Sequence, residues 1–335
     1  MLDILKKLIN TVSVSGSEGA ISEVIGALIT GCADEIKTDA LGSLIAVKKS
    51  GNPGAKKIML AAHMDEIGFI VTFIEDSGWL RVSQVGGINW AAASSNEVLF
   101  GSGLSGLLMP EGKASPNDYA GDKFFIDIGA ENRADAENKV KIGDVCTVAP
   151  KIVKLLNNRV AASKLDDKIA CAVLIKVLRD FKGLTPDHDL YFVFTAQEEL
   201  GVRGARTAAQ YIMPDYSIAV DVTGTGDTPE CTPMAIKLGG GAAIKLMDGS
   251  VICAKEMVNL LMKTAVENNI KYQSEILVRG GTDASAMQAA GAGSIAGAVS
   301  IPARYIHTGV EMCDMGDVDA CAGLLAAVLK KFNIY

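Results

Sequence analysis

The chain has 335 residues, enough for one large domain or two smaller ones with a substantial buried core. Its hydrophobic fraction of 49% excludes a disordered protein, and its 32 basic and 39 acidic residues are interspersed with a net charge of −7, which argues against a nucleic-acid-binding surface. The N-terminal segment MLDILKKLIN predicts an amphipathic helix instead of a signal peptide, and no apolar run approaches the roughly 18 residues of a membrane span.

The 7 cysteines are scattered along the chain, odd in number and without a CxxC pair. Such spacing predicts free, mostly buried thiols in a reducing compartment. We therefore expect a cytoplasmic protein without a zinc site built on cysteine.

The first 67 residues have the pattern of an α/β domain. Helical spacing covers residues 3–30, and strands are expected at 44–49 and 57–63. From Gly68 onward the pattern changes to short runs such as GFIVTFI, WLRVSQV, EVLFGSG and KFFIDIG, separated by Gly, Asn, Asp or Ser. These runs predict a small antiparallel barrel or sandwich.

After about Asn158 helices and strands alternate again. DDKIACAVLIKVLRDF is expected to be a helix, DLYFVFTA a buried strand, EELGVRGARTAAQYI a helix and YSIAVDV a strand, and further pairs lead to a last helix over residues 317–331. Such alternation is typical of a mostly parallel sheet flanked by helices. The predicted fold is thus an α/β domain, residues 1–67 and 164–335, interrupted by a β-barrel-like insert over residues 68–163.

Metal-binding side chains fall where the expected strands end, which is where sites form in open parallel sheets. They are His63 and Asp65, Asp166 and Asp167, Glu198 and Glu199, Asp221 and Asp227, and His307. Imidazole and carboxylate without thiolate suit zinc, cobalt or manganese. Because there are more donors than one catalytic ion needs, two ions about 3.5–4 Å apart that share a bridging carboxylate fit better.

Each candidate also has an ordinary structural explanation. A His at a strand end is often a half-buried polar residue, and two adjacent acidic residues often stabilise a helix N-terminus. His63 gains support from Asp65, because residues two apart on an extended segment face the same way and the carboxylate could orient the imidazole. Glu66 faces away from His63 on an extended chain, so we expect it to mark the exit into the insert instead of binding metal.

Two further residues, Asp283 and His188, lie beside expected strands or helices. Asp283 opens a helix after Gly280 and Gly281, so it either caps that helix or lies in a loop that contacts a ligand. His188 precedes a strand, and we expect it in a solvated loop at the opposite edge of the sheet.

Six segments occur in one order over nearly the full chain: AAHMDEIGF, LDDKIA, FTAQEELGVRGA, AVDVT with GDTP, RGGTDA, and RYIHTGVEM. Together they resemble the M42 family of metallo-aminopeptidases, and the resemblance implies a di-metal α/β domain interrupted by a barrel-like dimerisation domain. It implies that one ion is held by His63, Asp166 and Asp221, and the other by Asp166, Glu199 and His307. Glu198 would be the general base and Asp65 the partner that orients His63.

The resemblance also implies a substrate and an assembly. The substrates would be peptides with a free N-terminus, cleaved with two divalent ions per subunit, zinc or cobalt. By this resemblance, subunits of family members assemble as dimers into shells of twelve, so we expect a homo-oligomer. We expect neither nucleic acid nor a membrane as a partner.

Two other functions compete with an aminopeptidase. A polysaccharide hydrolase would need two carboxylates roughly 5–9.5 Å apart across a sugar, which adjacent Glu198 and Glu199 do not supply by themselves. It would also favour aromatic residues near the site, and only 5% of the chain is aromatic. A catalytically silent metal-binding scaffold would lack a base or a ligand, and none is missing.

Overall fold

The large domain is built on one mixed sheet. The structure is a computed structural model that describes residues 1–332. Within this range the strands of the large sheet are β1 Glu35–Thr38, β2 Leu44–Lys48, β3 Lys57–His63, β10 Ile152–Lys154, β11 Arg159–Ala162, β12 Asp189–Thr195, β13 Tyr216–Thr223, β14 Ala242–Met247, β15 Tyr272–Ile276, β16 Ile295–Arg304 and β17 Glu311–Asp314. Their order is β1-β2-β12-β3-β13-β16-β17-β11-β10, with β14 and β15 beside β16.

The four central strands, β12, β3, β13 and β16, run parallel to one another. Every residue of β3 from Ile58 to His63 is buried, as expected for a strand covered on both faces. Antiparallel strands extend the sheet at both edges, where β2 pairs with β12 and β17 pairs with β11. The predicted α/β fold with a largely parallel sheet is confirmed, although the sequence patterns did not reveal β1, β10, β11, β14 or β17.

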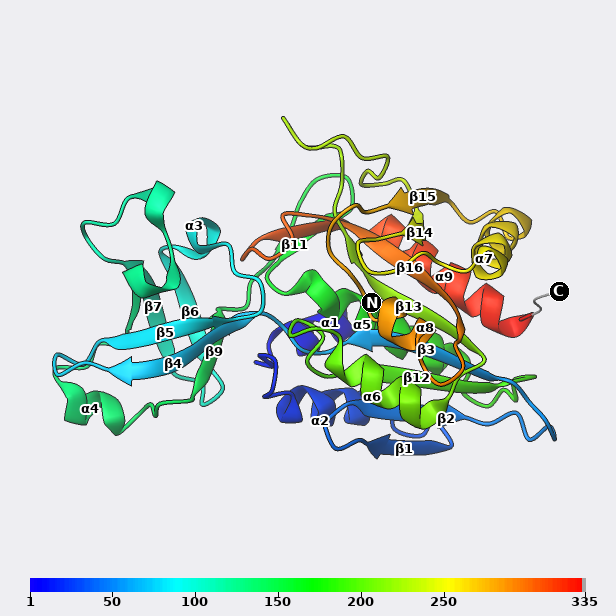
Figure 1. Cartoon of the computed structure of the whole chain (residues 1–335), viewed down its shortest axis with the longest axis horizontal. Coiled ribbons are helices and arrows are strands. Elements are labelled where there is room, and N and C mark those ends of the chain that lie inside the picture. The colour runs from blue at the N-terminus through cyan, green and yellow to red at the C-terminus, as the bar shows by residue number, and fades with distance from the viewer. Residues whose placement is uncertain (333–335) are drawn as a thin grey trace.

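Helices flank this sheet in two groups (Figure 1). They are α1 Leu2–Ile9, α2 Gly19–Leu28, α5 Leu165–Asp180, α6 Arg203–Ile212, α7 Lys255–Glu267, α8 Ala284–Gln288 and α9 Met315–Lys330. Helix α5 packs on β3, β13 and α9, whereas α6 packs on β12 and α8. Helix α1 buries Ile4, Leu5, Leu8 and Ile9 and exposes Lys6 and Lys7, which is the predicted amphipathic pattern. In residues 1–332 no helix has the length and apolar character needed to cross a bilayer.

The insert is a closed barrel that projects from one end of the large domain (Figure 1). Its strands are β4 Gly68–Ile74, β5 Leu80–Val85, β6 Asn96–Phe100, β7 Ser105–Pro110, β8 Phe124–Asp127 and β9 Val145–Val148, and its short helices are α3 Trp90–Ala93 and α4 Arg133–Glu137. Strands β4 and β9 pair and close the barrel around its own core, which includes Phe69, Val98 and Phe124. The predicted β-barrel-like insert is therefore present.

The two ends of the insert differ from each other. Strand β4 begins at Gly68, the first residue of the predicted insert. At the other end, β10 and β11 lie inside the predicted range of 68–163 but pair in the large sheet, through β17. The barrel's own strands end at Val148. Short strand-forming runs look alike in either sheet, so the pattern could not assign β10 and β11 to their partner.

A buried ionic cluster lies where the chain leaves β3 for the barrel. Glu66 is 1% exposed, and its carboxylate lies 3.5 Å from the Lys164 ammonium and 3.7 Å from that of Lys168. The Ser13 backbone N–H also donates to Glu66, at 2.8 Å. Glu66 therefore marks the exit into the insert, and it does so as a paired buried charge.

We expect Lys168→Met to lower the free energy of unfolding by about 3 kcal/mol, because it removes one of the two cations that compensate the buried Glu66 carboxylate. Lys176→Met on the same helix is the matched control, since its pair with Asp180 is exposed and worth less than about 0.5 kcal/mol. Urea unfolding at neutral pH measures both variants. Equal stability of the two variants would contradict the role given to the cluster.

Candidate metal centre

The predicted site residues meet at the carboxyl edge of the parallel strands. His63 ends β3, Asp221 lies near the end of β13, and His307 follows β16. The loop after β12 supplies Glu198 and Glu199. Together with Asp166 these residues line one cleft of about 610 Å³. The close packing of these strand ends follows from their parallel register, in which His63 lies opposite Thr195.

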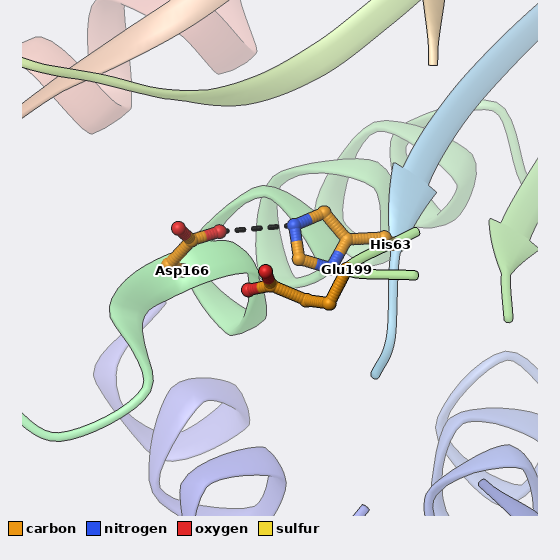
Figure 2. Close-up of side chains that lie close together, drawn as sticks. All are labelled: His63, Asp166 and Glu199. Carbon is orange, nitrogen blue, oxygen red and sulfur yellow. Dashed lines mark hydrogen bonds and ion pairs between the residues drawn. The ribbon is translucent and has the colours of Figure 1, made fainter. Parts of the chain in front are cut away.

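Asp166 lies between the two imidazoles, with one carboxylate oxygen toward each. Its Oδ1 is 2.9 Å from His63 Nε2, and its Oδ2 is 3.3 Å from His307 Nε2. Glu199 Oε1 is also 3.3 Å from His307 Nε2. Figure 2 shows Asp166 at the start of α5 in contact with the His63 ring, with the Glu199 side chain beside them. A carboxylate shared in this way has the arrangement of a bridging ligand.

The start of α5 departs from a regular helix at the acidic pair. Asp166 and Asp167 have non-helical backbone angles inside α5, so they are not simply the charged first turn of a helix. Asp167 is fully buried and accepts the His63 backbone N–H at 3.1 Å. Its other oxygen has no hydrogen-bond partner among the described residues. The Asp166 carboxylate therefore faces the two imidazoles, whereas the Asp167 carboxylate binds the backbone of His63.

The donor atoms gather in two overlapping groups. One contains His63, Asp166 and Glu199, the other His63, Asp167 and Asp221, and within each group the ligand atoms lie within 4.8 Å of one another. The Asp221 carboxylate is 3.8 Å from His63 Nε2. These are nitrogen and oxygen donors without a thiolate, so they fit divalent zinc, cobalt or manganese.

Asp65 contacts both the His63 imidazole and the loop that carries the two glutamates. The shortest contact to His63 Nδ1 comes from the Asp65 backbone oxygen, at 3.2 Å, while the carboxylate lies at 3.6 Å. The carboxylate also accepts the backbone N–H groups of Glu198 and Glu199, at 2.9 and 3.2 Å, and the Ser15 hydroxyl at 2.6 Å. Asp65 therefore fixes the loop that carries both glutamates as well as the imidazole.

Glu311 is a central residue that the sequence analysis did not single out. It is 2% exposed, and its carboxylate accepts the Asp166 backbone N–H at 2.9 Å and the His307 backbone N–H at 2.8 Å. Glu311 thus ties together the two segments that carry the shared carboxylate and the second imidazole. A charged residue within the short strand β17, between Val310 and Met312, was the available signal.

Buried acids crowd the centre and disturb one another. Burial raises the pKa values of Asp167, Glu198, Glu199, Asp221 and Glu311, and neighbouring carboxylates raise them further. Burial alone would lower the pKa of His63, but its hydrogen bonds to Asp166 and Asp65 hold it well above the usual range. Such crowding is costly in the free protein, and divalent cations among these oxygens would relieve it.

Three other sequence candidates are not among these donor groups. Asp227 forms a two-fold ion pair with Arg304, at 2.8 and 2.7 Å. His188 is only half-buried, but it packs edge-on against Phe332. Asp283 stands at the N-cap position of α8, but its side chain makes no capping hydrogen bond; it accepts the Thr195 hydroxyl at 2.6 Å, and its other oxygen has no partner among the described residues.

The barrel reaches the site through two glycines after β5. A Cβ at Gly87 would lie 3.1 Å from His307 Nδ1, and a Cβ at Gly86 would lie 3.3 Å from Glu199 Cβ. Gly86 also has a φ of +77°, which disfavours other residues. The barrel backbone therefore forms one wall around His307 and Glu199.

Comparison with known proteins identifies the family. The family model for M42 glutamyl aminopeptidase matches residues 42–324. The chain belongs to the M42 peptidase family. A putative aminopeptidase of Acetivibrio thermocellus is 47% identical over 98% of this chain and 98% of its own length. M42 peptidases are metal-dependent, which agrees with the donor set assembled here.

Two solved structures of the same architecture are similar over nearly the whole chain. The aminopeptidase APDkam598 of Desulfurococcus kamchatkensis has a TM-score of 0.93 and 32% identity, covering 98% of this chain and 94% of that chain. The TET1 peptidase of Pyrococcus horikoshii, which can assemble into a tetrahedron or a large octahedral shell, has a TM-score of 0.91 and 31% identity, covering 99% of both chains. This M42 chain thus shares the complete two-domain fold with peptidases.

Gly87→Ala should weaken metal binding by the M42 site about tenfold, because the added methyl group would displace the His307 imidazole. Gly101→Ala in the same barrel is the matched control, since a Cβ there meets no atom within 4 Å. Cobalt titration of metal-stripped protein, followed by visible absorption, measures the difference. Equal affinities would show that the barrel does not set the position of His307.

Proposed function

We propose that the chain is a di-metal aminopeptidase that removes the first residue from peptides with a free N-terminus. The observation that carries this proposal is the Asp166 carboxylate, set with one oxygen toward each of two imidazoles. A single catalytic ion would not need this arrangement. Membership of the M42 family supports the same reaction class.

Two divalent ions, zinc or cobalt, would share Asp166. His63 and Asp221 would complete the ligands of one ion, and Glu199 and His307 those of the other. When bound, the ions would polarise the substrate carbonyl and lower the pKa of a water molecule. Asp65 and Glu311 would hold these ligands in place through backbone and imidazole contacts, because metal ligation is sensitive to small displacements.

Glu198 would act as general base and then as general acid. Its carboxylate lines the cleft and makes no hydrogen bond or ion pair with another side chain in residues 1–332, so it is free to face a water molecule. Its backbone is fixed by Asp65 at 2.9 Å. The carboxylate would accept the proton of the attacking water and pass it to the leaving amine.

The same site would favour chain ends. A substrate's free α-amine would be recognised by an ion or by a carboxylate of this crowded centre, so internal peptide bonds would not be positioned. We also propose a homo-oligomer of dimers that build a dodecamer in the cytoplasm, supported by the shell-forming TET1 peptidase with the same fold.

A polysaccharide hydrolase is less consistent with the cleft. Apart from the two histidines no aromatic side chain is among its lining residues, so a sugar ring would find no platform for stacking. A silent scaffold would be expected to lack Glu198 or a ligand, and all of them face the same cleft.

Metal removal should abolish activity, and reloading with zinc or cobalt should restore it. Two peptides of one sequence, one with a free and one with an acetylated N-terminus, give the test. Release of the first residue only from the free peptide, and only with metal, is expected from the proposed site. Cleavage of the acetylated peptide would contradict an aminopeptidase.

Glu198→Gln should keep the metal and lower kcat about 10²–10⁴-fold, because the amide cannot accept the water's proton. Glu256→Gln, an exposed substitution on α7, controls for the loss of a surface charge. Metal content by elemental analysis and turnover on the free peptide are measured together. Retained turnover in Glu198→Gln would remove Glu198 from the role of base.

A further inference from the structure

The cleft holds no charged side chain that could bind a charged substrate residue. Its charged lining residues are the proposed ligands and Glu198, all engaged at the metal centre. The rest of the lining is uncharged: Gly201, Val202, Val222, Thr223, Gly224, Ser250, Leu277, Gly280, Gly281, Ser285 and Ile306. The negative charges of the four lining carboxylates would balance the positive charges of two divalent ions. With two ions bound, the formal charges of the lining residues would thus cancel.

Part of the cleft wall is bare backbone. Gly280 has a φ of +90°, and a Cβ at Gly281 would lie 2.7 Å from the Ser250 hydroxyl oxygen. Larger residues at these positions are therefore disfavoured. Beside them Leu277 supplies an apolar side chain that is half-buried. This stretch of wall offers peptide groups and hydrocarbon, and no ion.

A second hollow shares Asp166, Glu199 and His307 with the cleft and lies toward the barrel. The surface that it exposes is largely apolar, and Ile67, Phe69, Ile88 and Val148 are among its lining residues. Its remaining charges are already paired: Glu66 faces Lys164 at 3.5 Å, and Glu311 accepts two backbone N–H groups. A side chain entering from either side of the centre therefore meets no free charge.

The cations nearest in sequence to the lining do not reach into it. Arg203 follows Val202, and Arg279 precedes Gly280, but both side chains are exposed and neither lines the cleft. Arg203 is directed to Gln197, at 3.5 Å. An acidic substrate side chain would thus find no arginine or lysine in the cleft with which to pair.

We propose that this site selects peptides whose first residue has an uncharged side chain, with Leu277 as a specificity-determining residue. The inference rests on the proposed aminopeptidase activity and names its substrate class. A charged side chain would lose its hydration in the cleft without gaining a partner, whereas an aliphatic one would bury its surface against Leu277 and Ile306. Selection would thus come from rejecting charge as much as from binding hydrocarbon.

The metal-loaded enzyme is tested on peptides that differ only in the first residue: Leu, Met, Ala, Glu, Asp, Lys and Arg. We expect kcat/KM for the best uncharged residue to exceed that of every charged one at least about tenfold. A preference for Glu, Asp, Lys or Arg would overturn this inference while leaving the aminopeptidase in place. Failure to cleave any free peptide would instead overturn the proposed function.

Leu277→Lys tests the assigned residue. It should raise the ratio of kcat/KM for the Glu peptide over the Leu peptide about tenfold, because it adds the missing cation to the wall. Val278→Lys is the matched control, since Val278 is 69% exposed and does not line the cleft. Equal ratios in the two variants would remove Leu277 from the specificity site. Circular dichroism and metal content establish that both variants are folded and loaded.

Discussion

The Asp166 carboxylate must face two imidazoles at once, and much of the structure serves that geometry. The imidazoles come from different strand ends, and Asp166 comes from a third segment at the start of α5. The parallel strands bring the two imidazoles to a common edge, but they do not determine the position of Asp166. Glu311 does so, because its single carboxylate accepts a backbone N–H from the Asp166 segment and another from the His307 segment. The positions of Asp166 and His307 are thus set by a residue that lies outside the two groups of donor atoms.

The same arrangement recurs on the other side of the centre. Asp65 holds the loop of Glu198 and Glu199 by its backbone, and Glu18 holds the preceding Gln197 N–H at 3.0 Å. Both carboxylates are buried and are paired chiefly with backbone groups. The loop's side chains therefore remain available for the cleft, while its backbone has little freedom. A short loop between a strand and a helix can then carry two adjacent glutamates in different directions.

The fold and the gathering of the site could be predicted from the sequence because they depend on periodicity and on where strands end. The contacts that position the site could not, since they join distant segments: Glu311 to Asp166, Asp65 to Ser15, and Gly87 of the barrel to His307. Asp65 shows the limit well. Its two-residue spacing from His63 correctly places it beside the imidazole, but only the structure reveals that its carboxylate chiefly binds backbone N–H groups. Likewise β10 and β11 have no local pattern that distinguishes the barrel from the large sheet.

A buried ionic network connects Asp221 to the part of the cleft wall that carries Ser250. Lys245 and Glu275, both fully buried, form an ion pair at 2.5 Å, and Lys245 lies 3.6 Å from Asp248. Asp248 in turn accepts the Ser250 N–H and hydroxyl, at 2.7 and 2.8 Å. Lys245 is also among the charges that act on Asp221, whose pKa burial raises and this cation lowers. The wall that carries Ser250 is therefore fixed by one buried ammonium and two buried carboxylates that pair within the fold, and the cleft lining outside the metal centre is uncharged.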